Sequence, residues 1–209
     1  MCNRSYVFNI SDVRQEILFA AEKIMLQKGY MACTIKDICK VRSVAVSEFH
    51  LCFHSKEALG EIIILRFFER VLFDIKKTFR LGRKSAETEI TEYWHRTELH
   101  TTATSSQPAY FLTVLLCERV ILPDIVREAF NDGCLRLIDC LKDEISHCLS
   151  DSLHAHLIHP EACRDAAWLL LQSWSGTSLI TAAFQGDFCC DRAIETVRLM
   201  LLINNQHKC

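Results

Sequence analysis

Twelve cysteines are spread along the 209-residue chain, and a cysteine can act as a nucleophile, a metal ligand or a sensor of oxidants. The best-placed candidates are Cys189 and Cys190, in a turn before a predicted helix, and Cys134, which follows Asp132-Gly133. The positive end of a helix lowers a thiol pKa and so favours the reactive thiolate. Cysteine is also a common small core residue, so thiol sensing and simple packing both stay open here.

A group of metal-binding residue types lies between residues 147 and 159 and contains ligands that zinc or copper could use. Its members are His147, Cys148, His154, His156 and His159. Their spacing matches no common metal site, and the last two fall in a predicted polar loop. We therefore expect neither a bound metal nor a cofactor.

A cysteine paired with a histidine could also serve as a nucleophile and its base in an enzyme. No glycine elbow, phosphate-binding loop or paired-carboxylate motif accompanies such a pair in this sequence. The predicted helical architecture offers no loop to stabilise an oxyanion. We therefore expect a protein that is not an enzyme.

Large aromatic residues recur on the predicted helices of the second part of the chain. If these helices surround a cavity, the aromatic side chains would line a mostly apolar site for a small molecule. Ordinary core packing explains any one of them equally well, and the sequence does not choose. The candidates are Tyr93, Trp94, Phe111, Trp168 and Trp174.

Residues suited to contact DNA gather between positions 34 and 56. Hydroxyl and ammonium groups at predicted helix N-termini suit a phosphate, because free amide hydrogens and the helix dipole add to them. Small apolar side chains on a short helix can pack on thymine methyl groups, while Ser and His can hydrogen-bond to base edges or phosphate. The candidates are Thr34 and Lys56 at helix starts, Lys36 early in the first short helix, and Ala45, Val46, Ser47 and His50 on the second short helix.

The elements that would position these residues are predicted from apolar periodicity and capping signals over residues 34–59. Thr34 is a candidate N-cap with Asp37 three residues later, and apolar residues at helical spacing follow it. After a break at Arg42-Ser43, a second helix of about eight residues carries another apolar set, and Ser55 can cap a third helix. Two short helices joined by a tight corner form a helix-turn-helix, whose second helix can enter a major groove.

These residues resemble the N-terminal domain of TetR-type (TetR/AcrR) transcriptional repressors. After Gly29-Tyr30 comes the pattern I-x-D-I-x5-V-x4-F-x3-F-x-S-K-E-A-L, and the match extends over about residues 13–65. The chain departs from the family at Ser43, where the corner usually carries Gly, and along its second helix, where the family usually reads S-x-G-T-L-Y. His50 stands where the family has a phosphate-binding Tyr, and Glu48 is an acidic residue on the expected DNA side.

The resemblance implies an all-α protein with two parts. Residues 1–58 would form a three-helix helix-turn-helix DNA-binding domain, joined through a helix over 56–79 to a helical effector-binding and dimerisation domain over 59–209. It further implies a homodimeric repressor that binds a palindromic DNA operator and is released by a small-molecule effector. Two alternatives keep the fold: a repressor that senses oxidants or electrophiles through cysteine, and a degenerate dimer that binds proteins in place of DNA.

Composition agrees with this outline. Half the residues are apolar while Pro and Gly number only 3 and 6, so long helices with few breaks are expected. Residues 1–60 hold eight Lys/Arg against six Asp/Glu, whereas the rest holds sixteen against twenty, within a net charge of −2. A slightly basic head on an acidic body suits a DNA-binding head. No signal peptide or transmembrane run is visible, so we expect a cytoplasmic protein with reduced thiols and no membrane partner.

Nine helices are predicted in all. The first runs from Ser11, its expected cap, to Gly29, and the next two belong to the helix-turn-helix. The others cover about residues 56–79, 85–101, 109–120, 123–149, 160–184 and 190–204, with Pro123 in the first turn of its helix. Small residues around Gly176, together with the last helix, could form a four-helix interface between two copies of the chain.

Overall fold

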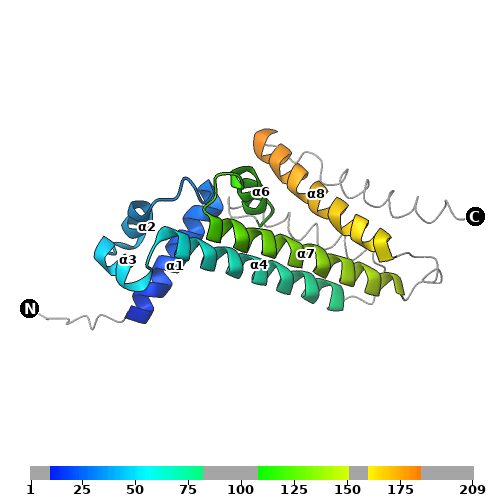
Figure 1. Ribbon diagram of the computed structural model, residues 1–209, viewed down its shortest axis with the longest axis horizontal. Helices are drawn as coiled ribbons and strands as arrows, with labels where there is room; N and C mark the ends of the chain where they lie inside the picture. Colours follow the sequence, from blue (N-terminus) through cyan, green and yellow to red (C-terminus); the bar gives the residue numbers. More distant parts are fainter. Residues whose placement is uncertain (1–9, 82–107, 151–159, 185–209) are drawn as a thin grey trace, which may run out of the picture.

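Seven α-helices make up the part of the chain that the computed structural model describes, which comprises residues 10–81, 108–150 and 160–184 (Figure 1). No strand occurs within those ranges, and the all-α prediction is confirmed. The helices predicted over 85–101 and 190–204 lie outside the described residues. In chain order the elements are α1 (Ile10–Lys28), α2 (Ile35–Arg42), α3 (Val46–Cys52), α4 (Lys56–Leu81), α6 (Pro108–Glu118), α7 (Asp124–Ser150) and α8 (Pro160–Phe184).

The first three helices pack together as a head at one end of the molecule (Figure 1). α1 places one face against both α2 and α3, because six of its apolar residues recur at helical spacing and are buried. Gly29 ends α1 with a φ of 85°, a left-handed conformation that glycine adopts without strain. The buried residues of the α1 face are Ile17, Leu18, Ala20, Ala21, Ile24 and Met25.

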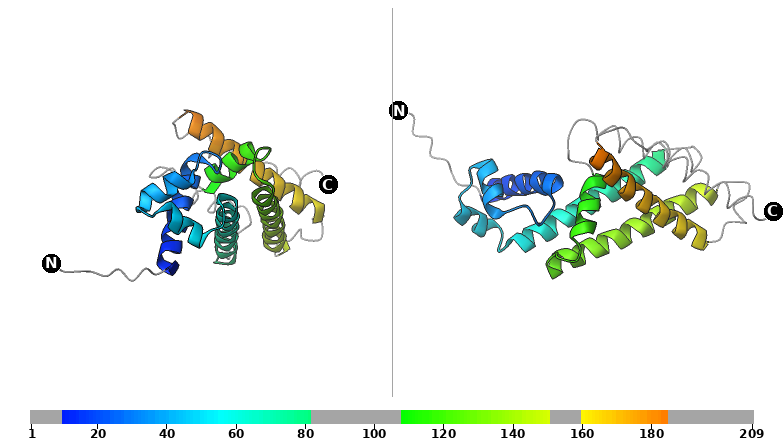
Figure 2. Two further views of the ribbon diagram at one scale, coloured as in Figure 1. Left: turned by 60° about the vertical axis from the view of Figure 1, so that its left-hand side comes forward. Right: turned by 90° about the horizontal axis from the view of Figure 1, so that it is seen from above.

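α4 joins this head to the rest of the chain and is buried on more than one side, as its many apolar residues predict. It contacts α1 in the head and runs beside α7 along the body in every view (Figures 1 and 2). α8 packs on both α6 and α7 and completes the described part of the body. A single continuous core therefore extends from the head through α4 into the body.

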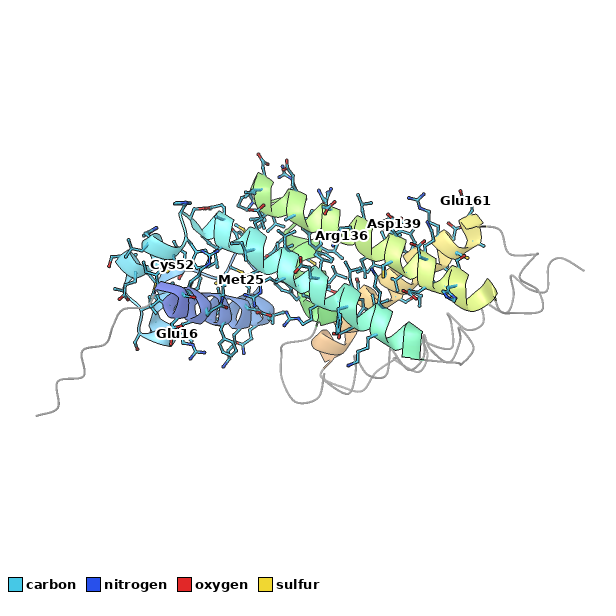
Figure 3. All side chains as sticks on the ribbon, turned by 90° about the horizontal axis from the view of Figure 1, so that it is seen from below. Glu16, Met25, Cys52, Arg136, Asp139 and Glu161 are labelled. Carbon is cyan, nitrogen blue, oxygen red and sulfur yellow. The ribbon has the colours of Figure 1, made fainter. Side chains whose placement is uncertain are left out.

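Aromatic rings fill the contact between α4 and the body helices. The ring of Phe67 meets that of Phe111 on α6 edge-on, with their centroids 5.0 Å apart. The ring of Phe68 lies 6.0 Å from that of Phe130 on α7. Gly133 on α7 allows this approach, because a methyl group at that position would collide with the Phe68 ring. Figure 3 shows the side chains between the helices and, on α7, the positions of Arg136 and Asp139, which are both exposed.

Several helix ends differ from the prediction by one or two residues, which is the usual uncertainty of helix boundaries. α1 begins at Ile10, so Ser11 lies inside its first turn and is not the N-cap. α7 begins at Asp124, so Pro123 precedes the helix. α6 ends at Glu118 instead of Val120, because the amide groups of Ile121 and Leu122 both turn back to the Glu118 carbonyl.

No helix within the described ranges has the length and apolar content needed to cross a membrane.

Candidate nucleic-acid interface

α2 begins at a complete capping box. The Thr34 hydroxyl oxygen accepts a hydrogen bond from the Asp37 amide at 3.1 Å, and an Asp37 carboxylate oxygen accepts from the Thr34 amide at 3.3 Å. The Thr34 hydroxyl also donates to the same carboxylate at 2.8 Å. The bonds from Thr34 lower the pKa of Asp37, because they stabilise the ionised carboxylate. The predicted N-cap is therefore confirmed, and its hydroxyl proton is already used within the head.

The corner between the two short helices is made by Ser43 in the left-handed conformation, with φ 53° and ψ 36°. A left-handed residue with a Cβ is strained, and glycine is the usual solution. The next amide, that of Val44, donates to the Cys39 carbonyl at 3.0 Å and closes the turn. The corner thus keeps its shape although the chain lacks glycine here.

α3 is a seven-residue helix, and its outward side is free of contacts that would hide it. Ala45, which the prediction placed on the helix, is its N-cap residue. Ala45, Val46, Ser47 and His50 are all exposed, with 45% of the Val46 surface accessible. Four of the residues predicted to face DNA therefore lie exposed on or at the start of one short helix.

Glu48 does not extend freely from this helix. Its carboxylate accepts a hydrogen bond from the Ala45 amide at 2.7 Å, and the side chain is half-buried. Ala45 has no side-chain group to cap the helix, so Glu48 supplies one half of a capping box from the N3 position. The negative charge at the start of α3 thus has a structural role.

The inner side of α3 is fixed by its two phenylalanines and one arginine from α1. Phe49 and Phe53 are buried with their ring centroids 5.8 Å apart. The guanidinium of Arg14 lies 4.4 Å from the centroid of the Phe53 ring and donates to the Cys52 carbonyl at 2.7 Å. These contacts hold α3 on α1 and leave its other face outward.

Of the two lysines predicted to contact DNA, Lys36 is exposed on α2. The ammonium of Lys56 instead lies 4.2 Å from the centroid of the Tyr30 ring and donates to the Met31 carbonyl at 3.4 Å. The Lys56 side chain is therefore half-buried on the loop between α1 and α2. Its helix does start at the predicted cap, because the Ser55 hydroxyl accepts a hydrogen bond from the Ala58 amide at 3.1 Å.

The same loop carries the main polar contact between head and body. The Glu118 carboxylate, at the end of α6, accepts hydrogen bonds from the amides of Tyr30 at 2.9 Å and of Met31 at 3.2 Å. A side chain at Gly29 would collide with this carboxylate. Burial raises the pKa of Glu118, and the two amide bonds act in the opposite direction. No local signal in the sequence could have shown this contact, because its partners lie about 90 positions apart along the chain.

Three of the five predicted pocket residues lie within the described part of the chain. Phe111 is fully buried in the α4–α6 contact and Trp174 is buried in the same core, whereas Trp168 is 42% exposed on α8. Their place in a ligand pocket therefore stays a prediction. Tyr93 and Trp94 lie outside the described residues.

Cys134 is the one redox candidate that the structure describes. It lies within α7 and not in a turn, and burial raises the pKa of its thiol to about 12. The charge of Arg119, which lies 15 positions earlier in the chain, acts in the opposite direction. Since a sensor needs a thiolate, this environment favours an inert thiol. Cys189 and Cys190 lie outside the described residues.

The predicted group of metal ligands is mostly outside the described residues as well. Among the residues that the structure does describe, no cluster of three or more His, Cys, Asp or Glu side chains has a geometry that could hold a metal ion.

A head of three helices, with an exposed short helix held behind a left-handed corner, defines a helix-turn-helix protein with a helical body. Across 92% of its length the chain has the fold of solved TetR/AcrR transcriptional regulators, and the resemblance seen over residues 13–65 is confirmed. No family model matches the sequence.

Several known proteins similar to this chain carry names of transcriptional regulators. The HTH-type transcriptional repressor NemR of Escherichia coli K12 is 25% identical over 145 residues, which cover 66% of this chain and 72% of NemR. This chain also superposes on the crystal structure of E. coli NemR in its reduced form, with a TM-score of 0.74 at 21% identity. The superposition covers 90% of this chain and 97% of the NemR chain.

Two further solved structures give the same result for the fold. A TetR transcriptional regulator from Legionella pneumophila superposes with a TM-score of 0.77 at 18% identity and covers 92% of this chain and 98% of its own. A TetR-family regulator from Agrobacterium tumefaciens also reaches 0.77, at 20% identity, and covers 92% and 97%.

Proposed function

We propose that this protein is a transcriptional repressor that binds a palindromic DNA operator as a homodimer and is released by a small-molecule effector held in its body. The observation that carries this proposal is the exposed face of α3, which the packing of Phe49 and Phe53 leaves directed away from the head. The names of the similar proteins support it. The protein would act in the cytoplasm, with residues 1–58 as the DNA-binding part and 59–209 as the effector and dimerisation part.

The proposed DNA contacts fall into two groups. Ala45, Val46, Ser47 and His50 would face base edges in the major groove, since the N-terminal part of a recognition helix makes such contacts. Lys36 would contact the phosphate backbone or a base from α2. Thr34 and Lys56 would lie beside phosphates at the N-termini of α2 and α4, where the helix dipole favours an anion, while their side chains are occupied within the head.

The proposal is tested by selecting bound duplexes from random oligonucleotides. The affinity of the protein for the most enriched sequence is then measured at several salt concentrations. A repressor should enrich a two-fold symmetric sequence. Lys36→Ala should lower affinity and reduce the slope of log K against log salt by about 0.9 for one lost phosphate contact. Lys76→Ala, an exposed lysine on α4 in the body, serves as the matched control. Failure to enrich any sequence would reject the proposal.

Two alternatives are less well supported. The non-DNA-binding dimer was suggested by Glu48, but this carboxylate caps its own helix. A cysteine-based sensor is suggested by the reduced form in which NemR was crystallised, yet burial of Cys134 opposes it. Release of operator DNA by peroxide, lost in Cys189→Ser or Cys190→Ser and restored by reductant, would favour the sensor. Release by a neutral apolar compound from a variant with those cysteines replaced would favour the pocket.

A further inference from the structure

The outward face of α3 lacks the side chains that most proteins use to recognise purines. Arginine and lysine make paired hydrogen bonds to guanine, and asparagine and glutamine do so to adenine. None of these four residue types occurs between Val46 and Cys52. Apart from His50, the exposed residues at the start of this helix and along it are apolar or short: Ala45, Val46, Ser47 and Leu51.

Three charged side chains near α3 are engaged elsewhere and do not replace the missing groups, whereas the exposed Lys36 and Lys40 belong to α2 and not to this face. Glu48 could accept a hydrogen bond from cytosine, but its carboxylate holds the Ala45 amide at 2.7 Å. The guanidinium of Arg42 lies 4.7 Å from the centroid of the exposed Phe19 ring on α1. Arg14 is likewise engaged, with the Cys52 carbonyl and the Phe53 ring.

Val46 is the apolar group best placed to read a base. It is the first residue of α3, and 45% of its surface is accessible in the free protein. The C5-methyl of thymine is the apolar group that a major groove presents, and cytosine lacks it. Contact between the two would remove apolar surface from water on both partners.

We propose that this protein reads its operator chiefly through thymine methyl groups, with Val46 as the specificity-determining residue. The preferred half-site would then be rich in A·T pairs, with thymine at the position that faces Val46. This inference rests on the proposed function, since it concerns which DNA the exposed helix recognises. Burial of one methyl group predicts a roughly fourfold change in affinity, which corresponds to about 0.8 kcal/mol.

The experiment uses the full chain and the operator obtained by selection. Each thymine of one half-site is replaced in turn by deoxyuridine, which removes only the C5-methyl and keeps every hydrogen-bonding group. Wild-type protein should lose affinity roughly fourfold at the thymine that faces Val46. Val46→Ala should bind the thymine and uracil duplexes equally at that position. Because Val46 is exposed, this variant should melt at the wild-type temperature, which is checked in parallel.

A matched control separates base reading from general affinity. Lys36→Ala should weaken binding to the thymine and uracil duplexes by the same factor, so its thymine-to-uracil ratio stays at the wild-type value. Equal wild-type affinity for both duplexes at every position would overturn methyl readout while leaving DNA binding intact. Selection of guanine-rich half-sites would overturn it too. If no duplex is enriched at all, both the repressor proposal and the proposal of methyl readout fail.

Discussion

Single residues decide the shape of the corner that presents α3. Ser43 occupies the left-handed conformation at the end of α2, and its strain is balanced by the packing of the helices on either side. TetR-type repressors usually carry glycine at this corner. Here Ser43 adopts the left-handed backbone conformation that glycine favours. The backbone strain at Ser43 should therefore lower the stability of the protein, and one substitution can relieve it.

Ser43→Gly should stabilise the protein. An L-residue in the left-handed region costs about 1 kcal/mol, and the greater freedom of glycine in the unfolded chain offsets part of the gain. We expect an increase of a few tenths to about 1 kcal/mol in the free energy of unfolding, measured by urea denaturation. Ser47→Gly, the matched control in helical conformation, should lower it by about 0.5–1 kcal/mol. A loss of stability in both variants would contradict strain at Ser43.

The capping box of α2 should make the head sensitive to acid. Hydrogen bonds from Thr34 lower the pKa of Asp37 below its ordinary value of 3.8. A depressed carboxylate pKa adds stability that is complete above the unfolded value and is lost as the pH falls below it. The gap in melting temperature between wild type and Asp37→Asn should therefore be constant above about pH 5 and shrink below about pH 4. Thr34→Ala should show the same narrowing, and a gap that does not change with pH would argue against this role.

At the scale of helices, much of the arrangement could be predicted because its causes are local. Pro160 starts α8 and the apolar run ends at Phe184, so both bounds agree with the prediction. Thr34 with Asp37, and Gly29, were recognised from residue type and spacing alone. The outward placement of Trp168 could not be predicted in this way, because which face of α8 is covered depends on where α6 and α7 lie.

The joint between head and body is the element that sequence reasoning missed. Glu118 accepts hydrogen bonds from two amides that follow the end of α1 and so lie outside its ladder of hydrogen bonds. Their partner is set by how α6 crosses α1, which only the folded chain decides. The same holds for Arg119 beside Cys134 and for Lys56 on the Tyr30 ring.

Glu118→Ala should loosen this joint. Loss of a carboxylate that accepts two amide hydrogen bonds should cost about 1–2 kcal/mol, at the low end of charged hydrogen bonds because the site is partly exposed. Hydrogen exchange at the Tyr30 and Met31 amides should become faster than in wild type. Glu128→Ala, an exposed glutamate on α7, is the control and should change neither quantity. Unchanged exchange at both amides in Glu118→Ala would show that the carboxylate does not hold the loop.

At the scale of the whole molecule, the head lies at one end of the paired α4 and α7, while α8 crosses the body (Figure 1). One such head offers a single recognition helix. A palindromic operator presents two half-sites about 34–36 Å apart, so its recognition requires two heads held at a fixed separation. Under the proposed function the chain would supply a second surface at which two bodies meet, and an effector would act by changing the separation that this surface sets.

Gly176 on α8 is where we expect that surface. A Cβ added there would meet no heavy atom of the described residues within 4 Å, so packing within the described part of the chain does not require a glycine. Gly176→Arg should leave the single chain folded yet place an unpaired charge in the contact between copies, where burial is costly. Light scattering should then show monomers, and operator affinity should fall by at least tenfold because only one head can bind.

Asp139→Arg places the same side chain on the exposed side of α7 and should stay dimeric with wild-type operator affinity. The pair of variants separates an effect of added positive charge from an effect of position. If Gly176→Arg remained dimeric with full affinity, the contact between copies would lie away from α8. The separation of the heads would then be set through another face of the body, and the effector would have to act on that face.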